Sequence, residues 1–324
     1  MQKELTQLKI AVLAGGIGSE RSISLLSGQT VCSALKEAGF TVVLSDITPD
    51  NTAILGDDSI DVFFPILHGQ FGEDGHLQQL FEQRNLCFTG SGSQASRLAF
   101  DKLLSKQVFF QAGLPIARHL VVHSSDTEAD LKQLLPRLAD KFVIKPVRQG
   151  SSVGVTITDD LNIAAAKAME CLHQYGDCMV EEFIAGREIT AGILNGTALP
   201  LIEIRSKAAF YDFKAKYESD ETEYLFDTIN DQSLVKKIQD TAAACFKELG
   251  CRHLSRVDFI VTNDGRPVIL EINTLPGFTS HSLLPMAARK AGISTPQLCR
   301  QIVEAAWKDY NNRSHRCSCR RSGS

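Results

Sequence analysis

Two acidic residues in a predicted β-hairpin are the clearest candidates for chemistry in this chain. The segment 256–282 reads RVDFIVTNDGRPVILEINTLPGFTSHS, in which two alternating apolar runs flank Asn-Asp-Gly. This pattern predicts a hairpin with a tight turn. If Asp264 and Gly265 form a two-residue loop, antiparallel pairing sets Asp258 opposite Glu271 and Arg256 opposite Asn273.

Residues two apart in a strand share a face, so these four side chains are expected on one side of the hairpin. Like charges placed directly opposite each other are destabilising unless something positive lies between them. A hard divalent cation with oxygen ligands, Mg²⁺ above all, meets that requirement. The alternative is a solvated strand face that tolerates its charges. A Pro-Gly loop and polar residues follow directly, where functional sites often collect.

Composition limits the classes of protein that this chain can belong to. Its 324 residues suffice for two or three domains or one large α/β unit, and 44% hydrophobic with 22% charged residues is ordinary for a soluble enzyme. A net charge of −4 argues against a nucleic-acid-binding surface. Neither a transmembrane run nor the apolar core of a signal peptide is apparent, so we expect a cytoplasmic protein without a membrane partner.

The nine cysteines are odd in number and include no CxxC pair, so we expect reduced, small hydrophobic side chains rather than a zinc or redox site. The basic tail HRCSCRRSGS is expected to be disordered or a foreign addition to the chain.

About the first 95 residues alternate between strand and helix patterns. LKIAVLAGG, FTVVLSDITP, DVFFPIL and a short NLCFTGS predict strands, and RSISLLSGQTVCSALKEAG and HLQQLFEQ predict helices. Such alternation indicates a parallel, doubly wound sheet. Ligands of these sheets lie beyond the carboxyl ends of the strands, here the segments 15–20 and 68–75.

A nicotinamide-dependent dehydrogenase is one alternative for this first unit. From Gly16 the sequence reads G-I-G-S-E-R, which supplies two glycines of the dinucleotide fingerprint but has Arg21 in place of the third. Asp46, at the end of the second strand, is the acid that would bind a ribose. Arginine cannot provide the close helix–strand packing of that third glycine. Glu20 either simply starts a helix, where the dipole favours it, or binds a substrate ammonium.

The middle of the chain carries features expected of a polyphosphate site. One amphipathic helix is predicted over 96–113, and strands over 117–122 and 141–146. The loop VRQGSSVGV lies between two strands; it is not a Walker A loop, but its backbone N–H groups can face phosphate oxygens and it can close as a lid. Lys102 and Lys145 add positive charge, although either alone is more typical of a solvated surface.

The segment CMVEEFIAGREITAGIL predicts a strand, a break and another strand. Residues 181–184 suit an adenine slot read by backbone groups, and Glu188 suits a ribose; the alternative is a solvated acidic pair at a strand end. The irregular, charge-rich FYDFKAKYESDETEY resembles a functional or disordered loop. Helices are expected at SLVKKIQDTAAACFKELG and TPQLCRQIVEAAWKDY.

Together these segments resemble the D-alanine–D-alanine ligases, a branch of the ATP-grasp ligases, over residues 10 to about 306. The matching motifs are AGGIGSERSISLLSG, HGQFGEDG, DKLLSK, KPVRQGSSVGV, KAKYESDETEY, RVDFIV and LEINTLPGFTSHSLLPMAA, in the family's order. The resemblance implies an N-terminal substrate-binding α/β domain (1–97) with the doubly wound parallel sheet that precedes an ATP-grasp fold. A two-lobed α+β ATP-grasp domain would follow, with a central lobe (98–186), a C-terminal lobe (187–312) and the tail (313–324).

In that family, ATP phosphorylates the carboxylate of a first D-alanine, and the amine of a second D-alanine attacks the acyl phosphate, for peptidoglycan precursor synthesis. The protein contributes positioning and charge neutralisation. The resemblance implies a cytoplasmic homodimer that uses ATP and two Mg²⁺ ions, with Mn²⁺ as a substitute. It assigns metal ligation to Asp258, Glu271 and Asn273, and nucleotide contacts to Lys102, Lys145, Ser152, Glu181, Phe183, Ile184, Glu188 and Lys216.

The resemblance also assigns substrate and catalytic roles. Glu20 would bind the ammonium of the first D-alanine with His68 nearby, and Ser282 and Leu283 would hold the carboxylate of the second, with Asn273 also at the substrate. Arg256 and the Gly277 N–H would stabilise the acyl phosphate and the tetrahedral intermediate. Glu20, Ser151 and Tyr217 match a hydrogen-bonded trio that orders a loop over the site and keeps water out.

Tyr217 favours the dipeptide over D-alanyl–D-lactate, because ligases that make the latter depart from tyrosine at this position. Lys214 replaces a common acid in the loop, and Ser22 replaces another after Glu20. A D-lactate-using or other ATP-grasp carboxylate–amine ligase therefore stays an alternative, as does a nucleotide-binding regulatory module without catalysis.

Overall fold

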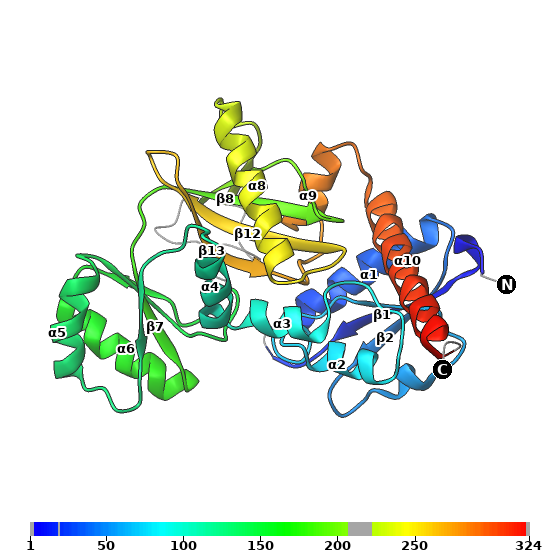
Figure 1. Ribbon diagram of the computed structural model, residues 1–324, viewed down its shortest axis with the longest axis horizontal. Helices are drawn as coiled ribbons and strands as arrows, with labels where there is room; N and C mark the ends of the chain where they lie inside the picture. Colours follow the sequence, from blue (N-terminus) through cyan, green and yellow to red (C-terminus); the bar gives the residue numbers. More distant parts are fainter. Residues whose placement is uncertain (1–2, 19, 207–221, 322–324) are drawn as a thin grey trace.

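The structure is mixed α/β, with its strands gathered into three sheets in the part of the chain that can be described. The computed structural model describes residues 3–18, 20–206 and 222–321, with side chains through residue 313. In Figure 1 a small sheet with two helices lies at one end, an N-terminal sheet lies at the other, and the largest sheet lies between and above them.

The N-terminal sheet is parallel and has the strand order β2-β1-β3. Its strands are β1 (Lys9–Gly15), β2 (Thr41–Ile47) and β3 (Val62–Pro65). Alternate residues of β1 pack on opposite faces, one against α1 (Arg21–Glu37) and α10 (Thr295–Arg321), the other against α2 (His76–Gln83). Burial on both faces explains the unbroken apolar run in β1.

The prediction of a fourth strand at NLCFTGS is wrong, because Phe88 makes only an isolated parallel bridge to Phe63. Directly after this bridge the backbone N–H of Gly90 donates to Nδ1 of the buried His253, at 3.0 Å. This contact turns the chain towards the largest sheet instead of extending the first one.

The single helix expected over 96–113 is two helices, α3 (Ser93–Phe100) and α4 (Lys102–Gln111). Asp101 separates them: its backbone is extended, and its side chain accepts from the N–H groups of Leu103 and Leu104 as the N-cap of α4. Aspartate at an N-cap satisfies donors that the first helical turn leaves without partners. The break starts a new helix at Lys102.

The small sheet is antiparallel, with the strand order β4-β7-β5-β6. Its elements are β4 (His119–Val122), β5 (Phe142–Lys145), β6 (Thr156–Thr158) and β7 (Cys178–Glu182), with α5 (Glu128–Leu138) and α6 (Leu161–Tyr175) packed on it. The VRQGSSVGV loop connects β5 to β6, which confirms its predicted place between two strands.

The largest sheet has the order β11-β10-β8-β12-β13, with β9 paired to β8. Its strands are β8 (Arg187–Leu194), β9 (Thr197–Ala198), β10 (Ile202–Ser206), β11 (Thr222–Leu225), β12 (Leu254–Val261) and β13 (Pro267–Asn273). One face packs against α8 (Gln232–Glu248), α3 and α4 through Ile189, Val257 and Phe259. The alternate residues of the same strands, including Asp258, face the other way.

The hairpin β12–β13 forms with the predicted register at the two acids, but its turn differs from the prediction. The loop has three residues, Asn263 to Gly265, because Thr262 N–H bonds to the carbonyl of Arg266 at 3.1 Å and Gly265 has a left-handed φ of +77°. The three-residue loop shifts the strand pairing by one residue. A bulge beside Asp258 leaves Leu270 unpaired and so restores the predicted pairing beyond it. Asp258 therefore pairs with Glu271, and Arg256 with Asn273.

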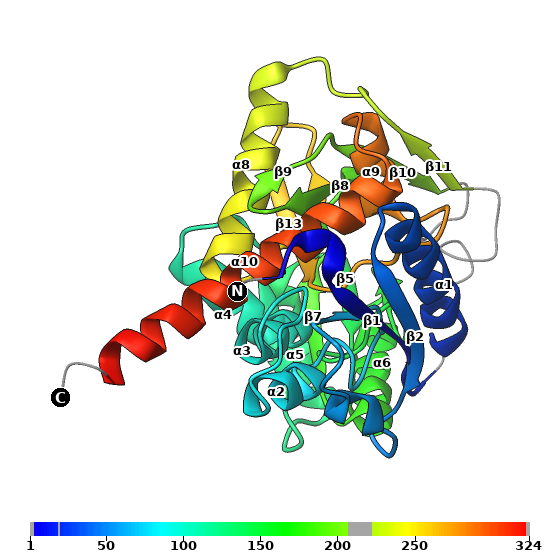
Figure 2. The same cartoon turned by 90° about the vertical axis from the view of Figure 1, so that its right-hand side faces the viewer.

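The remaining elements are two 3₁₀ turns (Leu5–Gln7 and Ala53–Gly56), α9 (Leu283–Lys290) and the end of α10. Helix α10 continues to Arg321, so its backbone is helical through most of the segment expected to be disordered, and Figure 2 shows this end leading away from the body. None of the helices in the described ranges is long and apolar enough to cross a membrane.

Packing of α1 on β1 generates a stability prediction at Gly28. A Cβ atom at Gly28 would lie 2.6 Å from the Cβ of Ala14 and 3.2 Å from Leu44 Cδ1. Gly28→Val is expected to lower the free energy of unfolding by about 2 kcal/mol, because overpacking against a backbone-fixed methyl cannot be relieved by a rotamer change. Ser33→Val, at an exposed position of the same helix, controls for helix propensity and is expected to stay within about 0.5 kcal/mol of wild type. Equal effects in urea denaturation would contradict the packing argument.

Candidate functional site

Two adjoining cavities lie where the three sheets meet. The first, of about 110 Å³, is lined by Glu20 at the N-cap of α1 and by residues from the loop after β3, the β5–β6 loop, the hairpin and the loop before α9. The second, of about 470 Å³, lies between the small sheet and the largest sheet. Both are lined by Lys102, Gln149, Glu188, Ile204, Asp258 and Glu271. A ligand can therefore extend from one cavity into the other past the acidic pair.

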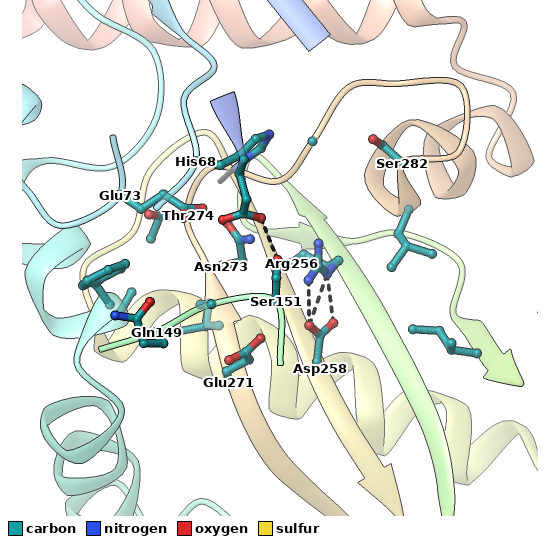
Figure 3. A pocket seen from close by; sticks show the side chains of 18 of the residues that line it. His68, Glu73, Gln149, Ser151, Arg256, Asp258, Glu271, Asn273, Thr274 and Ser282 are labelled. Carbon is teal, nitrogen blue, oxygen red and sulfur yellow. Dashed lines mark hydrogen bonds and ion pairs between the residues drawn. The ribbon is translucent and has the colours of Figure 1, made fainter. Parts of the chain in front are cut away.

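The acids of the hairpin point to the same side, as the sequence predicted (Figure 3). Arg256 makes a bidentate ion pair with Asp258, from Nε to Oδ1 at 2.9 Å and from the guanidinium NH2 group to Oδ2 at 2.8 Å. Thr190 Oγ1 donates to Asp258 Oδ1 at 2.6 Å, and Lys102 Nζ lies 3.3 Å from Glu271 Oε2. These cations offset the repulsion that two facing carboxylates would otherwise suffer.

The donor set on the hairpin fits a hard divalent cation. Asp258 and Glu271 supply carboxylate oxygens to both cavities, and Asn273 supplies an amide oxygen that accepts from the Leu275 N–H at 2.9 Å and has a second lone pair. Within the described residues no three His, Cys, Asp or Glu side chains gather closely enough to hold a metal by themselves. Mg²⁺ suits such a site because it binds through one or two carboxylates together with phosphate oxygens.

Glu20 joins α1 to the β5–β6 loop. Its Oε1 accepts a hydrogen bond from Ser151 Oγ at 2.6 Å, drawn as a dashed line in Figure 3. Ser151 and Ser152 both have left-handed φ angles, +51° and +59°, so this loop is held in a strained conformation above the hairpin acids. Tyr217, the third member of the expected trio, lies outside the described residues.

His68 and Glu73 come from the HGQFGEDG segment and face the first cavity. Burial lowers the pKa of His68, and the charge of Arg256 adds to this effect while Glu20 opposes it. In the described part of the chain no group hydrogen-bonds to His68 Nε2. Burial and the charge of Glu20 raise the pKa of Glu73 to about 8, although its Oε2 accepts from the Gly69 N–H at 2.6 Å. A neutral acid and a neutral imidazole therefore stand beside the ionised groups.

The loop before α9 completes the first cavity. Ser282 occupies the N-cap position of α9, and its Oγ accepts from the Thr279 N–H at 2.8 Å. A side chain at Gly277 would lie 2.8 Å from Ser282 Oγ and 3.8 Å from His68 Cε1, so glycine lets the backbone approach both. Leu283 lines the same cavity at the first turn of α9, where N–H groups favour an anion.

Charged residues line one side of the second cavity. Lys145 Nζ lies 2.7 Å from Glu181 Oε2, and Lys106 Nζ lies 2.6 Å from Glu181 Oε1. Burial by itself would raise the pKa of Glu181, but the ammonium groups of Lys145 and Lys106 hold it at about 2. The Glu181 carboxylate is thus occupied by both lysines, and its backbone is paired within the small sheet opposite His119 and Val143. Lys102 Nζ donates to the carbonyl of Gln149 at 2.6 Å.

Most of the other residues predicted to bind the nucleotide also line the second cavity. Ser152, Phe183, Ile184 and Glu188 all line the second cavity, with Val143, Ile157, Ile260 and Leu270 as apolar neighbours. Leu270 and Glu271 both reach the cavity although they are adjacent in the strand, which the bulge permits. Lys216 lies outside the described residues.

Sequence reasoning missed Lys106, Glu73 and Arg148. Arg148 joins the β5–β6 loop to two other elements: Nε bonds to Asp101 Oδ2 at 2.9 Å, and the guanidinium NH1 group bonds to Asp177 Oδ2 at 3.3 Å. The spacing of Lys102 and Lys106 by four residues places them on one helix face and could have indicated a pair. Nothing local distinguishes Glu73 or Arg148 from surface charges.

The dinucleotide alternative finds no support in the geometry of the first sheet. The guanidinium of Arg21 makes a bidentate ion pair with Asp46 and also donates to the carbonyl of Gly16 at 3.1 Å. Asp46 is therefore engaged with the very residue that replaces the third glycine, and it is not presented to a ribose.

The chain is similar to proteins of known activity over nearly its whole length. It matches the family models "D-ala D-ala ligase N-terminus" over residues 55–91 and "D-ala D-ala ligase C-terminus" over residues 108–304. A D-alanine–D-alanine ligase of Citrifermentans bemidjiense is 41% identical over 304 residues, 94% of this chain and 98% of the relative.

Solved structures of ligases share the fold of this chain. The D-alanine–D-alanine ligase from Bacillus anthracis complexed with ATP has a TM-score of 0.81 and 28% identity, covering 94% of this chain and 99% of that chain. The VanG D-Ala:D-Ser ligase from Enterococcus faecalis has the same TM-score and identity over 93% and 99%. The shared fold thus extends to ligases that differ in their second amino acid.

The raised pKa of Glu73 predicts a pH-dependent stability difference. The folded chain keeps this proton up to a pH of about 8, whereas the unfolded chain loses it near the ordinary value of 4.5. The stability contributed by the protonated group is full below that ordinary value and is lost as the pH rises through 8. Glu73→Gln, which mimics the neutral acid, is expected to gain stability relative to wild type between pH 5 and 8. Urea titrations across this range measure it, and a constant difference would contradict it.

Proposed function

We propose that the two cavities divide between them the ATP-dependent joining of two D-alanines, because the chain belongs to the D-alanine–D-alanine ligase family. The reaction serves cell-wall precursor synthesis, and the enzyme is a ligase. The observation that carries the assignment of roles is the shared acidic pair: Asp258 and Glu271 line both cavities. A triphosphate in the second cavity and an amino acid carboxylate in the first would meet there.

We assign nucleotide binding to the second cavity. Adenine would lie against the backbone of residues 181–184 with Phe183 and Ile184, and the ribose would lie near Glu188. Lys102, Lys145 and the left-handed serine backbone at Ser152 would contact the phosphates. Lys216 remains a predicted phosphate contact outside the described residues. The apolar and polar mixture of this cavity supports the assignment.

We assign the first D-alanine to the cavity beside Glu20, whose carboxylate would hold the ammonium while His68 packs nearby. One carboxylate oxygen of that substrate would attack the γ-phosphorus of ATP, so that ADP leaves and a D-alanyl phosphate forms. Direct amide formation would need oxide as leaving group, and phosphorylation supplies a better one. Positioning and charge neutralisation are the main contributions that a protein makes to such a transfer.

The second D-alanine would bind between Ser282, Leu283 and Asn273, with its carboxylate at the N-terminus of α9. Its amine would attack the acyl carbon, and phosphate would leave as the peptide bond forms. Arg256 and the Gly277 N–H are proposed to stabilise the oxygen charge of the tetrahedral intermediate. Arg256 is suited to this because its guanidinium sits beside Asp258 on the cavity wall.

Asp258, Glu271 and Asn273 would hold Mg²⁺, or Mn²⁺ in its place, and two such ions would neutralise charge on the transferring phosphoryl group. The Glu20–Ser151 hydrogen bond would keep the β5–β6 loop closed over the acyl phosphate and so exclude water. Tyr217 stays a prediction as the third member of this trio.

The finer architecture and the setting are also proposals. We propose that the N-terminal sheet is the doubly wound substrate domain (1–97), and that the small sheet (98–186) and the largest sheet (187–312) are the two ATP-grasp lobes. The location of the cavities between the sheets supports this division. We further propose a cytoplasmic homodimer, because the family resemblance implies one and ATP is a cytoplasmic substrate.

Substrate choice gives the first functional prediction. The purified chain with MgATP is expected to release ADP in a coupled assay with D-alanine and not with L-alanine, since the Glu20–Ser282 cavity orients one enantiomer. D-serine and D-lactate, added with D-alanine, test the alternative second substrates, and product analysis is expected to return D-alanyl-D-alanine as the main product. ADP release without dependence on D-alanine would contradict the proposal, and a mixed depsipeptide as main product would favour the D-lactate alternative.

The acidic pair, Asp258 and Glu271, gives a second functional prediction. Glu271→Gln is expected to reduce turnover by at least about a thousandfold, because it removes a charge that organises the phosphoryl transfer. Asp264→Asn, an exposed acid in the turn of the same hairpin, is the matched control and is expected to retain wild-type turnover. Circular dichroism establishes that both variants fold. Near-normal turnover of Glu271→Gln would contradict the metal assignment.

A further inference from the structure

We propose that Lys106 is a positioning residue for nucleotide binding, which acts by holding Glu181 so that the ammonium of Lys145 stays available to the phosphates of ATP. This inference rests on the proposed function of the second cavity and adds a residue to it. Lys106 does not itself touch a ligand, because it lies behind Glu181 and the cavity wall is formed by Glu181 and Lys145.

Lys106 is one of the most deeply buried charged groups in the described part of the chain. Its exposed fraction is 2%, the same as that of Glu181, while that of Lys145 is 7%. Long charged side chains are almost never fully buried unless they are paired. The two lysines take one carboxylate oxygen each, at 2.6 and 2.7 Å, so Glu181 is shared between an inner and an outer ammonium.

The charges of this cluster depend on one another. Burial lowers the pKa of Lys106, and the carboxylate of Glu181 opposes that shift. With all three groups ionised, two ammonium groups against one carboxylate leave one positive charge, and of the two ammonium groups it is that of Lys145 that lines the cavity. Without Lys106 the cluster would be neutral, and Lys145 would be the sole counter-ion of a buried carboxylate. Lys145 would then be drawn away from the phosphates.

The position of Lys106 on α4 adds a second argument. Lys102 lies four residues earlier, on the same face of the helix. Lys102 contacts Glu271 on β13 at 3.3 Å, whereas Lys106 contacts Glu181 on β7. One helix therefore links an acid of the largest sheet to an acid of the small sheet, and the second cavity lies between them. Loss of the Lys106 contact would release the small sheet from this link.

Stability by itself does not account for the cluster. A buried ion pair is often matched or exceeded in stability by apolar residues of similar volume, because desolvation offsets most of the attraction. Met at position 106 would fill nearly the same space as the lysine without charge. What Met cannot supply is the second ammonium that leaves the cluster with a positive charge.

The test uses the full-length protein and isothermal titration with ATP, ADP and adenosine, each with and without Mg²⁺. Lys106→Met is expected to weaken ATP and ADP binding at least about tenfold and adenosine binding less than about twofold, because the adenine contacts are to backbone. In turnover, KM for ATP is expected to rise while kcat at saturating ATP changes little. The matched control is Lys167→Met, which removes the lysine of an exposed pair with Glu170 on α6 of the same sheet layer.

A double variant separates positioning from simple loss of structure. Lys106→Met with Glu181→Gln removes one charge of each sign and so returns the cluster to one positive charge, on Lys145. It is expected to recover most of the ATP affinity lost in Lys106→Met, and it keeps the test decisive should the single variant fail to fold. Thermal melts accompany every titration.

Three results would overturn the inference: unchanged ATP binding in Lys106→Met, an equal loss for ATP and adenosine, or no recovery in the folded double variant. If the wild-type chain itself binds no ATP, the proposed function of the second cavity fails together with this inference. Unchanged binding in Lys106→Met beside normal wild-type binding would overturn the role of Lys106 alone.

Discussion

The site is organised around two carboxylates that the hairpin holds opposite each other. Asp258 and Glu271 would repel if nothing else were near, and the chain offsets that repulsion with Arg256 on the same strand and Lys102 on α4. Each of these groups comes with its own structural requirement. The bulge at Leu270 sets the register, and the break at Asp101 starts a helix with Lys102 in its first turn.

Burial gives these charges their strength. Interactions among ionised groups are worth more where water is excluded, and polar groups fixed in advance need no reorganisation during the reaction. The three sheets achieve this by contributing different walls: Glu20 and His68 come from the first unit, the β5–β6 loop and Glu181 from the small sheet, and the acids from the largest. The Glu20–Ser151 hydrogen bond and the two lysines of α4 hold the walls together.

Local patterns predicted most strands, the alternation of the first sheet and the facing acids. The predicted register of the acids is correct although the predicted turn is wrong. The three-residue loop shifts the pairing by one residue, and the bulge shifts it back by one. The break at Asp101 interrupts an apolar pattern that continues across it, so periodicity could not reveal it. Lys106, Glu73 and Arg148 owe their roles to partners distant in sequence, such as Glu181, Glu20 and Asp177. A single sequence carries no local signal for such contacts.

A crystal structure with Mn²⁺ and a non-hydrolysable ATP analogue, in which anomalous scattering locates the metal, tests the role of the acidic pair. We expect anomalous peaks between the phosphates and the side chains of Asp258, Glu271 and Asn273, with the adenine against residues 181–184. A nucleotide bound elsewhere, or metal peaks remote from the hairpin while both acids keep their pairs with Arg256 and Lys102, would contradict this expectation.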